Sequence, residues 1–162
     1  MAATYEPIYS TTLVSNQTSV NLSSFGGYTD LVLIVAGNSS AAGAAYTLQF
    51  NGDTASNYSQ TYLYGSGSGS GASGRGSNGT EMNIGNTDQS NNQTTIINIM
   101  NYANTTTYKT VISKGGGATI GAISYVGLWR KSPEAITSIR LGVNTGTINT
   151  NSVISLYGIK AA

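Results

Sequence analysis

Cysteine and histidine are both absent from this chain of 162 residues. Without cysteine there are no disulfides, no thiolate metal sites and no cysteine nucleophiles. Without histidine the chain lacks the side chain that titrates near neutral pH, which excludes Ser-His-Asp triads and HExxH zinc sites. We therefore expect no metal ion, no cofactor and no catalysis that depends on either residue.

Charged residues are scarce, at 8% of the chain, against about 25% in ordinary globular domains. The seven basic and six acidic side chains leave a net charge of only +1. A protein that follows a nucleic-acid backbone needs clustered Lys and Arg. Here the basic residues are scattered: Arg75, Lys109, Lys114, Arg130, Lys131, Arg140 and Lys160. The composition predicts no nucleic-acid partner.

The carboxylates are too few and too dispersed to nominate a general acid or base. They are Glu6, Asp30, Asp53, Glu81, Asp88 and Glu134, and the closest two are seven residues apart. A glycosidase needs only two carboxylates that the fold brings together, so polysaccharide hydrolysis remains a distant alternative. We predict a non-enzymatic protein with no catalytic residues.

Long apolar runs are missing as well. The longest, Leu31 to Ala36, has six residues, whereas a membrane-spanning helix needs about 20. The first fifteen residues carry neither a basic segment nor a continuous apolar segment, so they do not read as a secretory signal peptide. We expect no membrane partner.

What the sequence does contain is a series of short segments rich in β-branched and aromatic residues, separated by Gly, Asn and Ser clusters. This pattern is typical of strands and turns. In Tyr46 to Phe50 polar and apolar side chains alternate, which indicates an antiparallel strand with one buried face. Leu31 to Ala36 lacks the alternation and reads as a central strand. Strands are expected at 8–14, 19–22, 30–35, 46–51, 59–64, 94–102, 108–113, 120–130, 138–143 and 153–159.

No stretch holds a helical apolar period over three turns, and at most one turn of helix is expected, at Pro133. The predicted fold is therefore all-β: a single antiparallel β-sandwich domain over residues 1–162, best described as a jelly roll of about 8–10 strands. Residues 1–15 are expected to form an extended N-terminal arm that reaches a neighbour.

Two segments do not fit the strand pattern. Residues 65–79 have seven glycines and no apolar side chain larger than alanine, which predicts a Gly/Ser-rich surface loop. That loop is either flexible and solvated or ordered by a neighbouring subunit. Asn83 to Gln93 is also expected to be a loop.

The string Asn51-Gly52-Asp53-Thr54 has two readings. Carboxylate and amide oxygens beside a glycine suit calcium, but the acidic residues that would complete a calcium loop are missing. Asn-Gly pairs favour tight turns because both residues tolerate positive φ. A tight turn is the favoured interpretation.

The aromatic residues are the most informative group. Tyr58, Tyr62 and Tyr64 lie within seven residues, with 62 and 64 on one strand face. Tyrosine is enriched both at interfaces and where a polar ring-shaped ligand stacks, so these three side chains are candidates for a sugar, a subunit contact or the core edge. Trp129 and Arg130 are candidate subunit contacts, because Trp and Arg are enriched in interface hot spots.

Several strings together resemble a family of small tailed-phage virion proteins: F-N-G-D-T followed by N-Y-S, then I-M-N-Y, Y-K-T-V, V-G-L-W-R, A-I-T-S-I-R-L and S-L-Y-G-I. The resemblance covers about Tyr28 to Ile159. It implies a jelly-roll domain that assembles as a trimer, either as a head decoration protein or as the terminal domain of a tail-associated protein. It brings no catalytic residues with it.

The resemblance implies an oligomeric capsid decoration (cement) protein, made in the host cytoplasm and located in the virion. Its partners would be itself, as a homotrimer, and the major capsid protein or other virion proteins. Binding only to the assembled shell would stabilise that shell by mass action. The alternative is a receptor-binding or tail-fibre tip module, in which the tyrosines stack on host-surface glycans.

Overall fold

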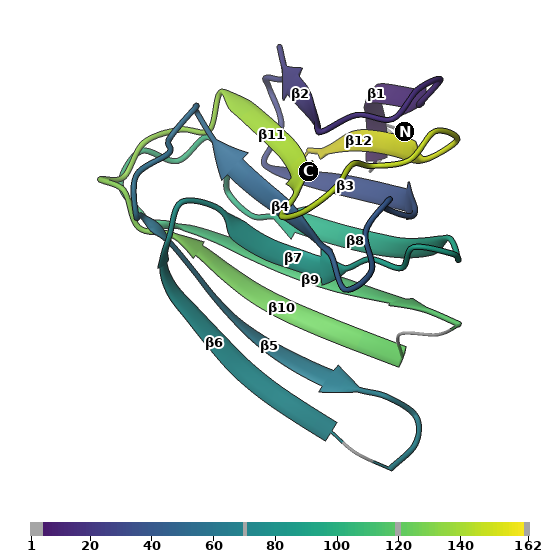
Figure 1. The fold of residues 1–162 in the computed structure, drawn as a ribbon. Helices are drawn as coiled ribbons and strands as arrows, with labels where there is room; N and C mark the ends of the chain where they lie inside the picture. The colour runs from purple at the N-terminus through teal and green to yellow at the C-terminus, as the bar shows by residue number, and fades with distance from the viewer. Residues whose placement is uncertain (1–4, 70, 119–120, 161–162) are drawn as a thin grey trace.

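The computed structural model describes residues 5–69, 71–118 and 121–160, which form two antiparallel sheets packed face to face (Figure 1). The large sheet has eight strands in the spatial order β1 (Tyr5–Thr12), β12 (Val153–Ile159), β3 (Asp30–Gly37), β8 (Gln93–Ile99), β9 (Lys109–Gly117), β10 (Gly121–Trp129), β5 (Tyr58–Gly65) and β6 (Gly71–Gly79). The small sheet has four, in the order β2 (Ser19–Ser23), β11 (Ser138–Val143), β4 (Ala45–Phe50) and β7 (Met82–Asn86). The described residues contain no helix, so none is present that could span a bilayer.

The predicted all-β sandwich is confirmed, and its strand pairing is nested. Strand β1 pairs with β12, β2 with β11, β3 with β8 and β4 with β7, so the two halves of the chain form one long antiparallel ribbon. Successive strands of this ribbon alternate between the two sheets. A ribbon rolled up in this way is a jelly roll.

Two inserted hairpins, β5–β6 and β9–β10, account for the strands beyond these eight. Both join the large sheet next to β8, in the order β9, β10, β5, β6. The small sheet ends at β7, which packs over β9, β10 and part of β5. Figure 1 shows β5 and β6 running past this edge at the lower part of the sheet. The inner face of the large sheet is therefore wider than the layer that covers it.

The core lies between the sheets and includes a cluster of three aromatic rings. The Trp129 indole is 2% exposed and stacks on Tyr58 with ring centroids 6.4 Å apart. Phe50 meets the same indole edge-on at 5.6 Å. Such aromatic pairs are worth about 0.5–1.5 kcal/mol beyond their buried area, so this end of the sandwich is firmly held.

The prediction of a loop over residues 65–79 was wrong for most of its length. The segment turns at 66–69 and returns as β6, which pairs with β5 from Gly65↔Gly71 to Tyr58↔Gly79. A ladder of backbone hydrogen bonds needs no large side chain. Glycine-rich composition therefore did not prevent a strand at this edge.

Two smaller expectations also need correction. The predicted loop from Asn83 to Gln93 is shorter, because β7 extends to Asn86 and β8 begins at Gln93. The expected N-terminal arm is, in its described part, the edge strand β1 from Tyr5, while residues 1–4 lie outside the described residues. The expectation of at most one turn of helix at Pro133 agrees with the structure, where the chain forms bends.

The tight turn predicted at Asn51 and Gly52 is confirmed. Their φ angles are 52° and 66°, and the Asp53 amide donates to the Phe50 carbonyl at 2.9 Å. Two central residues with positive φ are the mark of a type I′ turn. The turn places the Asp53 carboxylate beside the ring cluster.

Candidate functional site

A hollow of about 310 Å³ lies where the small sheet ends and the inner face of the large sheet continues. We call it the inner groove. Its wall comes from the free edge of β7, and its floor from β5, β6 and β10. The lining residues are Gly43, Ala45, Tyr62, Tyr64, Ala72, Asn83, Asn86, Ile123, Tyr125 and Asn144.

Strand register places the tyrosines of the inner groove on one face. Tyr62 is directly opposite Tyr125, and Tyr64 is opposite Ile123. Directly opposed residues of an antiparallel pair project to the same side of the sheet. The Tyr62 and Tyr125 rings lie 5.5 Å apart. Tyr125 is buried, whereas Tyr62 and Tyr64 are half-buried. The outer part of the groove therefore presents two partly accessible phenol rings.

Gly74 in β6 leaves room for the Tyr62 ring. Gly74 is opposite Tyr62 in the register. A Cβ atom at residue 74 would lie 2.6 Å from Cε1, Cζ and Oη of the Tyr62 ring. The ring therefore lies across β6 in space that any larger residue would occupy. Gly74 is thus a positioning residue for Tyr62.

Asparagine amides supply the polar part of the inner groove. The Tyr125 hydroxyl donates to Asn86 Oδ1 at 2.9 Å, and the Ala45 amide donates to Asn144 Oδ1 at 2.9 Å. Each asparagine therefore has its acceptor oxygen engaged. Neither Nδ2 group has a hydrogen-bond partner among the described residues, and the same holds for the side chain of Asn83. An Nδ2 group donates two hydrogen bonds, so these amides can donate to a ligand.

The inner groove is electrically neutral. None of its ten lining residues is charged. Burial raises the pKa of the Tyr125 hydroxyl to about 12, so that hydroxyl stays protonated at neutral pH. The groove can therefore offer stacking surfaces and hydrogen bonds, but no ion pair.

A second hollow, also about 310 Å³, adjoins the first and shares Gly43 and Asn86 with it. We call it the loop hollow, because it lies over the β7–β8 connection. Its other lining residues are Ala42, Thr87, Asp88, Gln89 and Ser90. Asp88 accepts a hydrogen bond from the Ser90 amide at 2.7 Å, and this bond lowers the pKa of the carboxyl. The loop hollow therefore contains a carboxylate.

The structure separates the candidate aromatic residues that the sequence grouped together. Tyr62 and Tyr64 line the inner groove, but Tyr58 is completely buried and its hydroxyl donates to the Asp53 carbonyl at 3.1 Å. Trp129 is also in the core, so its expected role as a subunit contact is corrected to a packing role. Both side chains are buried because Phe50 of β4 and strand β7 cover their end of the inner face.

Arg130 is exposed at the end of β10 and lies outside both hollows. Its guanidinium donates to Asn78 Oδ1 at 2.8 Å. Its role as a subunit contact stays a prediction.

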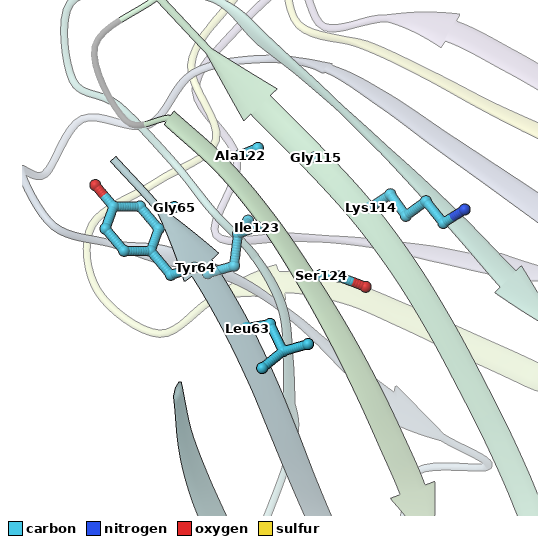
Figure 2. Close-up of a pocket in the computed structure, with 8 residues that line it drawn as sticks. All are labelled: Leu63, Tyr64, Gly65, Lys114, Gly115, Ala122, Ile123 and Ser124. Atoms are coloured by element: carbon cyan, nitrogen blue, oxygen red, sulfur yellow. The ribbon is translucent and has the colours of Figure 1, made fainter. Parts of the chain in front are cut away.

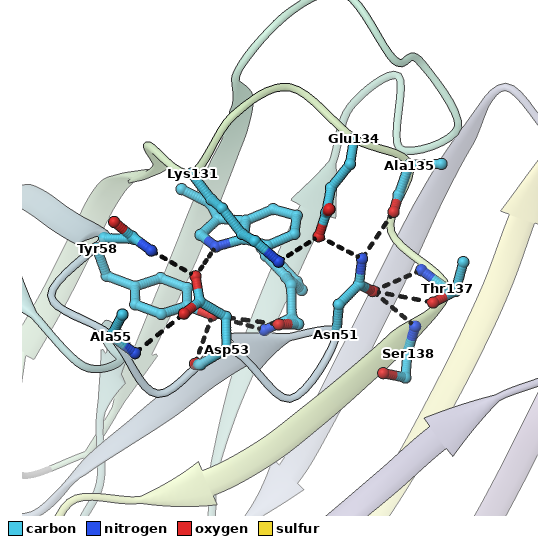
Figure 3. A network of polar contacts seen from close by, with 12 residues as sticks. Asn51, Asp53, Ala55, Tyr58, Lys131, Glu134, Ala135, Thr137 and Ser138 are labelled. Atoms are coloured by element: carbon cyan, nitrogen blue, oxygen red, sulfur yellow. Dashed lines mark hydrogen bonds and ion pairs between the residues drawn. The ribbon is translucent and has the colours of Figure 1, made fainter.

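Asp53 is a brace for the ring cluster rather than a cation ligand (Figure 3). Its Oδ2 accepts from Trp129 Nε1 at 2.7 Å and from Asn57 Nδ2 at 2.9 Å, while Oδ1 accepts from the Ala55 amide at 3.0 Å. Burial alone raises the pKa of this carboxyl, but the hydrogen bonds outweigh it and hold the pKa below its ordinary value. No group of three or more metal-binding side chains occurs among the described residues.

The asparagines of the inner groove escaped the sequence analysis. Asn83 and Asn86 lie on β7, and Asn144 follows β11, so only the fold brings them together. One local signal was available: Met82 and Ile84 are buried on either side of half-buried Asn83, which is the alternation of a strand.

The outer face of the large sheet carries exposed apolar side chains beside polar and charged ones. Leu63, Ile96, Val126 and Leu128 are 66%, 43%, 45% and 37% exposed. A shallow hollow of about 390 Å³ lies at the end of β5, β9 and β10, and Lys114 is the one charged residue in its lining. In Figure 2 the side chains of Leu63, Ser124 and Lys114 lie on one side of these strands and the Tyr64 ring on the other.

No protein-family model and no curated protein matches this chain. Among solved structures, an exo-inulinase from Aspergillus awamori is similar at a TM-score of 0.45 and 16% identity, over 96% of this chain and 29% of that one. A mutant of the alginate lyase Aly36B in complex with alginate tetrasaccharide is similar at a TM-score of 0.23 and 10% identity, over 98% of this chain and 75% of that one. Neither likeness bears on what this chain binds.

Proposed function

We propose that this chain is a non-enzymatic binding domain whose inner groove holds a carbohydrate. The observation that carries the proposal is the pair of half-buried rings, Tyr62 and Tyr64, beside asparagine amides that lack partners within the described chain. A sugar ring has an apolar face that packs on an aromatic ring and hydroxyl groups that bond to amides. An amphipathic site with a few placed polar groups suits such a ligand.

The state of the carboxylates supports a binding role rather than hydrolysis. Glu6 pairs with Lys160 at 3.0 Å, Glu81 with Arg140 at 3.6 Å and Glu134 with Lys131 at 3.0 Å. Asp30 accepts from the Asn101 amide at 2.5 Å, and Asp53 braces Trp129. Only Asp88 lines either of the two hollows. A glycosidase needs two carboxyl groups facing one bond.

Substitution of the accessible tyrosine tests the proposal. We expect Tyr64→Ala to weaken glycan binding roughly two- to tenfold, because an aromatic contact is worth about 0.5–1.5 kcal/mol and about 1.4 kcal/mol is tenfold in affinity. Tyr108→Ala is the matched control, since Tyr108 is 59% exposed and lines neither hollow. A glycan array followed by calorimetry measures the effect. Equal losses in the two variants, or no binding by the unchanged chain, would refute a carbohydrate site.

The resemblance to tailed-phage virion proteins supplies the biological setting of the proposal. In that setting the ligand is a glycan of the host surface and the chain is a receptor-binding module of the virion. Immunogold labelling of intact particles tests the location. Label confined to the tail agrees with receptor binding, whereas label over the head favours the second candidate below.

The second candidate is an oligomeric capsid decoration protein, and the exposed apolar side chains of the outer face favour it. A stable interface buries about 800 Å² on each partner, and exposed contiguous apolar side chains commonly mark such surfaces. In this proposal copies of the chain associate as a homotrimer through the outer face and dock on the major capsid protein. Particles lacking the chain would then lose resistance of the head to heating.

A further inference from the structure

We propose that the ligand is a neutral oligosaccharide of at least two sugar units, which extends from the tyrosines of the inner groove across Gly43 and Asn86 into the loop hollow. The inference rests on the proposed function and adds the charge, the length and the path of the ligand. Three observations carry it: the charge of the two hollows, their shared wall, and the polarity of the groups in each.

Charge excludes acidic sugars. The only charged residue that lines either hollow is Asp88, and it is negative. The nearby cations face elsewhere: Arg75 is opposite Thr61 in the register and therefore projects to the outer face, and Arg140 pairs with Glu81. A uronate, sialate or sulfate would give up its hydration without gaining a cation. It would also be repelled by Asp88.

Geometry gives the minimum length. The two hollows have equal volumes of about 310 Å³ and meet at Gly43 and Asn86. Each volume is at the lower end of the range for small-molecule pockets. Residue 43 leaves the junction open, because a Cβ atom there would meet no heavy atom within 4 Å. A chain of two or more units can therefore pass from one hollow to the other.

The two hollows differ in whether their side chains donate or accept hydrogen bonds. In the inner groove the Oδ1 atoms of Asn86 and Asn144 are engaged, so these side chains offer Nδ2 donors to oxygen atoms of the ligand. In the loop hollow Gln89 uses its Nε2 to donate to the Ser40 carbonyl at 3.0 Å, which leaves Oε1 as an acceptor beside the Asp88 carboxylate. The first sugar unit thus meets amide donors, and the second meets the Gln89 Oε1 acceptor. Hydroxyl groups satisfy both.

A ligand-length series on the unmodified chain is the first test. Glycan arrays carrying neutral hexose and N-acetylhexosamine oligosaccharides, together with sialylated, uronic-acid and sulfated ones, identify the preferred sugar. Calorimetry with its monosaccharide, disaccharide and tetrasaccharide then measures the effect of length. We expect a neutral sugar, and at least a tenfold gain in affinity from one unit to two. An acidic preference, or equal affinity for one unit and two, would overturn the inference.

A variant at the junction tests the path. Gly43 has a φ of 67°, which asparagine tolerates better than other residues. We expect Gly43→Asn to remove the gain in affinity from one sugar unit to two. Gly27→Asn is the control, because Gly27 has a φ of 79° and equally open surroundings but lines neither hollow. An unchanged length dependence in Gly43→Asn would contradict the path.

Different results would overturn the carbohydrate site and the inference that its ligand is neutral. Binding of acidic glycans that Tyr64→Ala abolishes would overturn the neutral-ligand inference and leave carbohydrate binding standing. Absence of binding to every glycan by the folded chain would overturn both.

Discussion

Tyr62 can lie across β6 because residue 74 has no side chain. Its ring reaches the position that a Cβ atom at Gly74 would otherwise occupy. The same segment, 65–79, has the composition of a flexible linker. In β6 these glycines leave space for neighbouring side chains. We therefore expect that a methyl group in place of a hydrogen atom at residue 74 changes the groove.

We expect Gly74→Ala to displace the Tyr62 ring and weaken glycan binding roughly two- to tenfold, the range that corresponds to an aromatic contact of about 0.5–1.5 kcal/mol. Gly71→Ala is the matched control in the same strand, since its Cβ would meet its nearest atom, the Tyr64 carbonyl oxygen, at an ordinary 3.6 Å. Calorimetry compares the two. Equal binding by both variants would show that clearance at residue 74 does not matter.

The Asp53 carboxylate stabilises the ring cluster of Phe50, Tyr58 and Trp129. Removing its carboxylate leaves the buried Trp129 Nε1 without an acceptor. We expect Asp53→Ala to lower the free energy of unfolding by about 2 kcal/mol, the usual cost of an unsatisfied buried donor. Chemical denaturation measures it. A decrease in the free energy of unfolding below about 0.5 kcal/mol, small beside that cost, would contradict a stabilising role for Asp53.

The same carboxylate makes stability depend on pH. The pKa of Asp53 is lower in the folded chain than its ordinary value, so its contribution is complete above about pH 4 and is lost as the pH falls through the folded pKa. We expect the unfolding free energy to fall as the pH drops below about 4, and less steeply in Asp53→Asn. Glu134 and Asp88, whose pKa values are also lowered, account for the remaining slope. Identical slopes in the two proteins would exclude Asp53 as a source.

At the scale of elements, β6 and β7 form the inner groove, and both were assigned to loops from composition. Each is an end strand of its sheet. Strand β6 has one partner only and buries no residue, so it lacks the apolar alternation of an interior strand. Strand β7 keeps that alternation at Met82 and Ile84 but has only five residues. Strand prediction from side-chain pattern is therefore weakest at the two places that shape this site.

The exposed position of β6 predicts uneven hydrogen exchange. Local opening needs little energy where few side chains are buried, and β6 has no buried residue whereas β8 buries four of its seven. We expect amides of 71–79 to exchange at least roughly tenfold faster than those of 93–99, and to slow when the glycan binds. Mass spectrometry of peptides from the two strands tests this. Equal rates would mean that something else holds β6.

At the scale of the whole molecule, the two proposed surfaces lie on opposite sides of one sheet. Tyr62 and Tyr64 face inward, whereas the intervening Leu63 faces outward. Association through the outer face would leave the inner groove of every copy open. Several grooves on one assembly would then raise the avidity for a multivalent glycan surface without any new contact.

Sedimentation tests the association. We expect the unmodified chain to sediment as a trimer at micromolar concentration, and the double variant Ile96→Lys with Val126→Lys to sediment as the 16.7 kDa monomer, because lysines oppose burial of the outer face. Val14→Lys is the control, since Val14 is 95% exposed but lies outside the sheets. A stable monomer of the unmodified chain would contradict self-association.

The fold class, the turn at Asn51 and Gly52, and the shared strand face of Tyr62 and Tyr64 could all be predicted from the sequence. These follow from local physics: a two-residue period of side chains, and the tolerance of Asn and Gly for positive φ. The absence of cysteine and histidine likewise excludes whole classes of chemistry whatever the fold.

Which residues on that face are accessible could not be predicted without the packing of the two sheets. Tyr58, Tyr62 and Tyr64 share one strand and one face, yet the first is buried and the others are half-buried. The difference depends on where β7 ends above them, and the same layer buries Trp129 and brings Asn83, Asn86 and Asn144 to one groove. Alternation along a strand tells which side a residue faces, but burial depends on what segments distant in sequence pack against that side.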